Sequence, residues 1–465
     1  MSRQTQISVS ASRYGGRPLV RWALRLAASV FWGLADMGWA LAGSLSRGLV
    51  QVRLGLMDLP ARMVRGLKAI PDATADLAIG AGLKAFELRW PIVTMASLAG
   101  ATAIAGQWPS SARSILAPPQ QPVQLMSVVA PAAKTAPAPK PGPVALQQAL
   151  NALSRDYGET VGIAILDTQA NWMVDVRGDK AFPQQSVSKL WVALTILDSI
   201  DRGAVSLDQG VVLTDADRSV FNQPISYQIT ADGFPTTVSD LLKRALIESD
   251  NAANDKLMGL AGGPGAVRRL LKDKKLDGIA LSEDERHLQA HIAGLTWTQD
   301  LAPYGAFNAA RARLPTAARE AALEAYISHP YDGAQPKAVA TALAQLHAGQ
   351  LLSEGSSAWM LGTLAKTTTG PNRLKGGLPE GWRIAHKTGT GQDFQGASIG
   401  INDVGLVTAP DGRTYAIAVF LQKTKRPISE RLAFLQSISQ ALVAQWERDA
   451  DQAVSPSAKE SRSAD

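Results

Sequence analysis

Apolar and β-branched residues form short runs in two places that lie far apart in the chain. The first pair of runs, 160–166 and 172–176, is separated by the polar stretch 167–171, which is typical of a hairpin turn. Three more strands are expected near the other end, at 382–386, 397–407 and 414–422. The last two are joined by Pro-Asp-Gly-Arg, another turn sequence.

Helical periodicity fills the interval between these two groups of strands. Apolar positions at helical spacing occur from Val187 to Ser356, and a final helix is expected over about 429–448. Strands at both ends with helices between them predict an antiparallel sheet completed by two distant segments. The fold class predicted from this pattern is therefore α+β.

The N-terminal third has a different pattern. Residues 90–108 carry no charge, begin and end with tryptophan, and are about long enough to cross a bilayer. The preceding arginines predict a cytoplasmic N-terminus, although a buried helix of small residues is the alternative. The apolar stretch 19–52 is interrupted by charges, so it is either a second span or an amphipathic helix on the membrane surface.

These patterns divide the chain into regions. A basic, membrane-associated region (1–89) precedes the expected anchor (90–108), and a linker rich in Pro and Ala (109–143) follows it. The catalytic region is expected over 144–449, and the polar tail 450–465 is expected to be disordered.

Composition and charge narrow the possible functions. The 465 residues include no cysteine, which excludes disulfides and thiol catalysis and removes the usual structural zinc ligand. The net charge is +7, and residues 1–89 hold twelve Lys/Arg against five Asp/Glu. Because the basic residues lie mostly outside the catalytic region, we expect no nucleic-acid partner and favour an anionic membrane surface.

Three short motifs carry the candidate chemistry. Ser186 is followed three residues later by Lys189 at the start of an apolar helix, so that a hydroxyl and an amine share one helical face. Ser249-Asp250-Asn251 follows a second helix, and Lys387-Thr388-Gly389 precedes a strand. Alone, each is equally typical of a helix cap or a strand end. In this order they form the signature of penicillin-recognising serine enzymes.

From about residue 145 to residue 447 the chain closely resembles class A β-lactamases. The likeness extends to Phe182-Pro183, to Gly262-Gly263-Pro264 and to the Leu-Pro-x-Gly-Trp run at 378–382. The resemblance implies a sheet with helices on both faces beside an all-helical lobe, with the active site between them. It implies no metal and no cofactor.

The resemblance also implies roles in bond cleavage. Ser186 would be the nucleophile and Lys189 a candidate base for acylation, although a glutamate is the competing candidate in this family. The backbone N–H groups of Ser186 and Thr390 would form the oxyanion hole. Ser249 would pass a proton to the leaving nitrogen.

Other positions would bind the substrate. Asn251 would hold both the side-chain amide of the substrate and Lys189, and Lys387 would supply positive potential for the substrate carboxylate. The remaining contacts would come from Thr388, Gly389, Thr390 and Arg373, the last at a position where some members carry a carboxylate-binding arginine.

A glutamate that activates the hydrolytic water separates β-lactamases from enzymes that are only acylated. Counting without gaps from Gly262-Gly263-Pro264 places Glu285 on this position, with Gln289 in place of the family's asparagine. The alternative is that 283–285 is only a solvated acidic turn.

Two departures from the family surround this glutamate. The positions that often pair as arginine and aspartate are Glu283 and Asp332 here, so that ion pair must be absent. After Gln289 the chain also runs on to Tyr331, longer than the family loop, with an inserted helix expected at 309–325. His287 and His291 lie four residues apart in this stretch, and we interpret them as surface residues rather than metal ligands.

Three functions fit these observations. The first is a β-lactamase anchored in the inner membrane, with its catalytic domain in the periplasm and a small β-lactam as substrate. The second is a D,D-peptidase acting on peptidoglycan stem peptides, and the third is a sensor that is acylated without turnover. Glu285 distinguishes the first function from the other two.

Overall fold

The computed structural model describes residues 137–460, with side chains described as far as residue 452. The chain divides into two compact units, 1–127 and 128–465, and the described residues all lie in the second. The expected basic region, membrane anchor and most of the linker therefore lie outside the described residues. Among the described residues, no helix has both the length and the apolar character needed to cross a membrane.

The central sheet joins strands from both ends of the domain, as the sequence pattern predicts. Its order is β1 (Lys140–Pro141), β3 (Trp172–Val176), β2 (Val161–Asp167), β11 (Thr414–Thr424), β10 (Ala397–Thr408) and β8 (Arg383–Gly389). The short β9 (Asp393–Phe394) also pairs with β10. Only β1 pairs in parallel, and the two distant segments meet where Ile163 of β2 lies opposite Val419 of β11.

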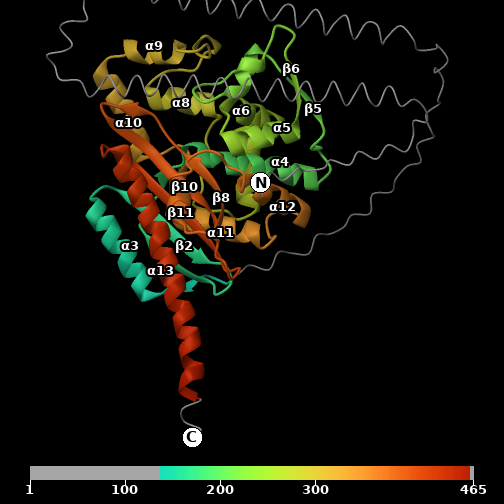
Figure 1. The fold of residues 1–465 in the computed structure, drawn as a ribbon. Coiled ribbons are helices and arrows are strands. Elements are labelled where there is room, and N and C mark those ends of the chain that lie inside the picture. The colour runs from blue at the N-terminus through green and yellow to red at the C-terminus, as the bar shows by residue number, and fades with distance from the viewer. Residues whose placement is uncertain (1–136, 461–465) are drawn as a thin grey trace, which may run out of the picture. The chain divides into compact units, whose positions relative to one another are not determined.

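Alternation along the strands builds two cores, one on each face of the sheet. Ile163 and Ile165 of β2 pack in the core beneath α3 (Val144–Tyr157) and α13 (Ile428–Glu460), while Ala164 and Leu166 face the other core, which includes α11 (Pro336–His347). Figure 1 shows α3 and α13 lying together along one side of the sheet. The helix α13 runs past the predicted end near Arg448, so residues 450–460 are helical and not the disordered tail expected.

The helical lobe is built around α4 (Lys189–Asp201), which is buried from Lys189 to Ser199. It packs against α6 (Asn251–Leu260), α7 (Pro264–Asp273) and α12 (Glu354–Leu364). A helix α5 (Val238–Lys243) and the hairpin of β5 (Gly210–Leu213) and β6 (Phe234–Thr237) complete the lobe. This sheet between helices, beside a helical lobe, is the α+β architecture that the sequence implies.

The insert after Gln289 holds two helices and not one. Beyond α8 (Glu285–Ala293), the chain forms α9 (Ala306–Arg313) and α10 (Thr316–Ser328), so the prediction of a single helix at 309–325 is wrong. The reason is Pro315, because the residue before a proline avoids the helical region, and Leu314 is extended at φ −69° and ψ 143°. Phe307 of α9 anchors the insert in a small core with Val220, Ala290 and Ala293.

A second short sheet fastens the end of the insert next to the first motif. The strand β4 (Phe182–Pro183) pairs with β7 (Gly333–Ala334), with Phe182 opposite Ala334. This pairing brings Asp332, at the end of the insert, close to the residues that precede Ser186. The insert is thus attached at both of its ends to the elements that carry the motifs.

Candidate active site

Three side chains from two separate segments meet at the centre of the domain. Ser186 lies in a 3₁₀ turn (Gln185–Ser188) that leads directly into α4, and Lys189 is the first residue of that helix. The ammonium nitrogen of Lys189 donates to Ser186 Oγ at 2.8 Å and to Glu285 Oε2 at 2.8 Å. Lys189 is completely buried and Glu285 is 4% exposed, so this carboxylate does not belong to a solvated turn.

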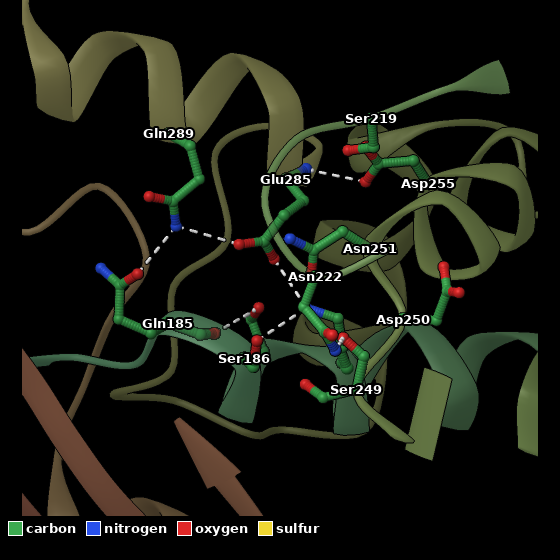
Figure 2. Close-up of polar contacts among 12 residues, drawn as sticks. Gln185, Ser186, Ser219, Asn222, Ser249, Asp250, Asn251, Asp255, Glu285 and Gln289 are labelled. Carbon is green, nitrogen blue, oxygen red and sulfur yellow. Dashed lines mark hydrogen bonds and ion pairs between the residues drawn. The ribbon is translucent and has the colours of Figure 1, made fainter. Parts of the chain in front are cut away.

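The position of Glu285 is set by the start of α8 and by α6. Asp284 caps α8 by accepting the N–H of His287 at 3.1 Å, and Asp255 of α6 accepts the N–H of Glu285 at 2.8 Å. Ser219 donates to the other oxygen of Asp255 at 2.7 Å. Burial, followed by the carboxylate of Asp284, raises the pKa of Asp255 to about 7. Figure 2 shows this contact beside the cluster formed by Glu285 and Ser186.

Gln289 lies one helical turn after Glu285 and faces the same cluster. Its Nε2 donates to Glu285 Oε1 at 2.9 Å and to Gln185 Oε1 at 2.7 Å (Figure 2). The backbone carbonyl of Gln289 and its side-chain Oε1 both accept from Nε2 of Gln392, a residue that follows the third motif. Sequence patterns do not single out Gln185 or Gln392, because glutamine has no distinctive spacing, although both lie within six residues of a motif.

Ser249 and Lys387 form a second polar pair on the opposite wall. Ser249 has left-handed backbone angles (φ 61°, ψ 35°) directly after a π-helical turn, Arg244–Glu248. Such backbone strain and π-turns concentrate at functional sites. Lys387 Nζ donates to Ser249 Oγ at 2.9 Å and to the carbonyl of Thr388 at 2.9 Å. Burial, followed by the charges of Lys189 and Arg373, lowers the pKa of Lys387 well below its usual value.

Asn251 enters the site from the first turn of α6. Its Nδ2 donates to the carbonyl of Val220 at 2.7 Å, and its buried Oδ1 has no partner among the described residues. The hydrogen bonds of Lys189 go to Ser186 and Glu285, so the expected contact between Asn251 and Lys189 is absent from the structure. The orphaned oxygen leaves an acceptor for a group that enters the cleft.

The strand β8 and Arg373 form the remaining wall. Arg373 donates from Nη1 to the carbonyls of Gly389 and Asn402 at 2.7 and 2.6 Å, and from Nη2 to Thr390 Oγ1 at 2.6 Å. Burial lowers the pKa of Arg373. A Cβ on Gly389 would come within 2.5 Å of the carbonyl of Gln184, so only glycine lets β8 approach the turn that carries Ser186.

The loop that carries Glu285 is fastened without the family's ion pair. Asp332 accepts from Tyr326 Oη at 2.8 Å and from the backbone N–H of Gln185 at 2.7 Å. Burial raises the pKa of Asp332 to about 7. Glu283 Oε2 instead lies 2.9 Å from His291 Nδ1, and His287 Nδ1 contacts Asp284 Oδ1. The described residues contain no cluster of three His, Asp or Glu side chains suited to a metal ion.

Comparison with known proteins gives this arrangement a family. A model of the "Beta-lactamase enzyme family" matches residues 145–446. The chain belongs to the β-lactamase enzyme family. It is similar to β-lactamase VEB-1 of Pseudomonas aeruginosa, with 30% identity over 57% of this chain and 78% of the relative. It is also similar to extended-spectrum β-lactamase PER-1 of the same organism, with 29% identity over 60% of this chain and 80% of the relative.

Solved structures of β-lactamases, one of them described as class A, are also similar to this chain. A β-lactamase from Chitinophaga pinensis matches with a TM-score of 0.53 and 28% identity, over 64% of this chain and 97% of the other. A variant of an ancestral class A β-lactamase of Gram-negative bacteria matches with a TM-score of 0.53 and 28% identity, over 66% of this chain and all of the other. The protein is thus an enzyme of the class A β-lactamase type.

The cleft of this class A β-lactamase has a volume of about 460 Å³. It is lined by the motif residues together with groups from outside the motifs, among them Phe221, Asn308, Arg311 and Gln392. Asn308 and Arg311 come from the insert, and Phe221 meets Phe307 of the insert edge to face at a centroid distance of 5.0 Å. The insert therefore forms one side of the cleft.

Proposed function

We propose that this enzyme hydrolyses the β-lactam amide through an acyl-enzyme on Ser186 and that Glu285 activates the water that releases it. The observation that carries the proposal is the position of Lys189 Nζ, 2.8 Å from both Ser186 Oγ and Glu285 Oε2. These contacts bring the nucleophile, an amine and a carboxylate into one buried cluster that opens on the cleft. The hydroxyl is thus in contact with the amine of Lys189, and Lys189 contacts the carboxylate of Glu285. Lys189 can accept the proton of the hydroxyl once it has given one of its own to Glu285.

In the acylation step, Ser186 Oγ attacks the β-lactam carbonyl and its proton passes to the cluster. Lys189 and Glu285 are both candidates for the accepting base, since the two groups are in contact. The backbone N–H groups of Ser186 and Thr390 would stabilise the oxyanion, a contribution of about 10²–10³ in rate per donor. When the lactam C–N bond breaks, Ser249 gives its proton to the nitrogen and takes one from Lys387 Nζ, 2.9 Å away. The proton that the cluster took from Ser186 would then restore the charge of Lys387, which leaves Glu285 ionised for the second step.

In the deacylation step, a water between Glu285 and the ester carbonyl attacks the acyl carbon. Glu285 takes the proton of this water, and the cluster returns one proton through Lys189 to Ser186 Oγ, which leaves as the alcohol. The amide of Gln289 holds Glu285 Oε1 at 2.9 Å, which keeps the other carboxylate oxygen toward Lys189. General-base catalysis of this kind contributes about 10²–10⁴ in rate.

The substrate would be recognised by its two polar ends. Thr388 and Thr390 line the cleft at the end of β8, and Lys387 is buried next to Thr388. A substrate carboxylate there would meet two hydroxyl groups and the positive potential of one ammonium. Arg373 reaches the same wall through Thr390 Oγ1. The orphaned Oδ1 of Asn251 would accept the side-chain amide N–H of the substrate.

Intact-mass spectrometry of the full-length chain with a penicillin tests the nucleophile. A covalent adduct of one penicillin is expected on the wild type and none on Ser186→Ala. Turnover of a chromogenic cephalosporin by the wild type should accompany it. An adduct that survives in Ser186→Ala would reject Ser186, and a wild-type adduct that persists for hours would favour a D,D-peptidase or a sensor.

For location, we propose an inner-membrane anchor at 90–108 with the catalytic domain in the periplasm. The support is the uncharged tryptophan-bounded segment, the arginines before it and the proline-rich linker after it. Protease added to spheroplasts should release an active fragment that begins within the linker. Complete protection of the activity in intact spheroplasts would contradict this topology.

A further inference from the structure

A continuous chain of side-chain hydrogen bonds connects the inserted helix α9 with Glu285. Arg311 Nη1 donates to Gln392 Oε1 at 2.7 Å, and Gln392 Nε2 donates to Gln289 Oε1 at 3.0 Å. Gln289 Nε2 then donates to Glu285 Oε1 at 2.9 Å. Gln392 and Gln289 are 7% and 2% exposed, so water competes little with these bonds. These hydrogen bonds thus connect the guanidinium of Arg311 on the insert with the carboxylate of Glu285.

The chemistry of the two ends fixes every amide between them. A guanidinium only donates, so Gln392 must turn its oxygen to Arg311 and its NH₂ to Gln289. The backbone carbonyl of Gln289 only accepts, and it takes a second bond from the same NH₂ at 2.7 Å. Gln289 must therefore accept on its oxygen and present its own NH₂ to Glu285, which as a carboxylate also only accepts.

The opposite amide orientation would harm catalysis. If Gln289 were turned over, its oxygen would face Glu285 Oε1 at hydrogen-bond distance, and two acceptors would repel each other. The same rotation would also place its NH₂ toward the donor group of Gln392. One orientation of the two amides lets all three hydrogen bonds run in the same direction from guanidinium to carboxylate, and aligned hydrogen bonds strengthen one another in a buried setting.

We propose that Arg311 and Gln392 are positioning residues for deacylation, which set the amide of Gln289 and through it the carboxylate of Glu285. This inference rests on the proposed role of Glu285 as the base that activates water. Arg311 acts through two amides, because its own side-chain hydrogen bonds go to Gln392 and Asn308 and not to Ser186. The insert therefore serves catalysis as well as forming a side of the cleft.

The hydrogen-bond chain from Arg311 to Glu285 affects only one of the two chemical steps. Ser186 and Lys189 contact each other directly, at 2.8 Å, and their contact does not pass through Gln289. With Lys189 as the base for acylation, that step should be insensitive to Arg311, while deacylation depends on the water activated by Glu285. A role limited to fastening the insert would instead change substrate access and stability, because α9 lines the cleft mouth.

Arg311→Met tests this distinction, because it keeps the length and apolar stem of the side chain and removes every donor. Arg311→Lys keeps a charge and one donor for Gln392. Arg313→Met is the matched control, since Arg313 is an exposed arginine on the same helix. The full-length wild type and the three variants are mixed with a cephalosporin under single-turnover and steady-state conditions, and acyl-enzyme is followed by quenched-flow mass spectrometry.

For Arg311→Met, we expect deacylation to slow about tenfold, a fraction of the general-base contribution, while the acylation rate stays within about twofold. Acyl-enzyme should accumulate, Arg311→Lys should recover most of the rate, and Arg313→Met should match the wild type. Equal deacylation in Arg311→Met and the wild type would overturn the proposal. So would parallel losses in both steps together with a lower Tm. Failure of the proposed function is distinguishable, because the wild type itself would then show no turnover.

Discussion

The carboxylate of Asp255 accepts the backbone N–H of Glu285 at 2.8 Å, so a buried acid on α6 fixes the start of the helix that carries the general base. Asp255 is 5% exposed, and its second oxygen accepts from Ser219 at 2.7 Å. Among the described residues its ion-pair contact is a long one, with Arg286 Nε 3.9 Å from its Oδ2. The hydrogen bonds of Asp255 to Glu285 and Ser219 therefore require an acidic side chain to be buried, which costs free energy of folding.

A pH-dependent stability follows from this arrangement. The folded pKa of Asp255, about 7, lies above its usual value of 3.8, so the folded state binds more protons than the unfolded state between these pH values. The free energy of unfolding should therefore fall as pH rises from about 4 to 7. Asp255→Asn keeps an acceptor for Glu285 N–H and gives Ser219 a donor, so it should flatten this fall and raise stability at pH 8 by on the order of 1 kcal/mol.

Urea unfolding between pH 4 and pH 8 measures this difference. Asp277→Asn, at an exposed aspartate, serves as the control and should leave the profile of the wild type unchanged. An Asp255→Asn profile parallel to that of the wild type would show that Asp255 stays ionised when folded.

Glu285→Gln should separate acylation from deacylation. The substituted amide cannot take a proton from water, and deacylation should fall by about 10²–10⁴ while Ser186 is still acylated. Mass spectrometry should show the acyl-enzyme as the main species during turnover. Glu283→Gln, two residues earlier and outside the cluster, should turn over like the wild type. Undiminished turnover by Glu285→Gln would assign the base to another carboxylate, Glu320 or Glu324 of the insert being the next candidates.

Lys387 should cause kcat/KM to fall on the alkaline side of its pH profile, at a lower pH than an ordinary lysine would. Its pKa is lowered by burial and by neighbouring cations, so its charge is lost as pH rises, at lower pH than usual. The value of kcat/KM for an anionic substrate should fall with that loss. Lys387→Arg retains its charge at high pH and should move this fall to higher pH, as measured by kcat/KM from pH 6 to pH 11. An identical fall in both proteins would place the titrating group elsewhere.

Tyr326→Phe should loosen the fastening of the loop that carries Glu285. The hydroxyl accepts from Gln185 Nε2 at 2.6 Å and donates to Asp332 at 2.8 Å, and the residue is completely buried. Its removal leaves two buried polar groups without a partner, which costs about 1–3 kcal/mol. Thermal denaturation should show a lower Tm, whereas Tyr331→Phe, at a 40% exposed tyrosine, should not change it. An unchanged Tm for Tyr326→Phe would mean that water or a rearrangement satisfies both groups.

Much of the fold is determined by local patterns in the sequence. The apolar runs 160–166 and 414–422 predict strands β2 and β11, because a short apolar run bounded by turn residues is typical of a strand that is buried on both faces. The motif spacing likewise places Ser186 and Lys189 on one helical face. The gap-free count to Glu285 also leads to a residue that contacts Lys189.

The network around Glu285 was decided only by the tertiary structure. Gln289 and Gln185 are 104 positions apart, and Gln392 and Arg311 are 81 positions apart, so no local periodicity relates them. Because Glu283 and Asp332 stand at the positions of the family's ion pair, the sequence predicts that this pair is absent. It does not predict that Tyr326 and Gln185 bind Asp332 instead. Long-range contacts between single polar residues leave no repeating pattern, whereas burial of apolar faces does. The sequence therefore determines the elements and the reacting groups, while packing of the insert determines which side chains hold them in place.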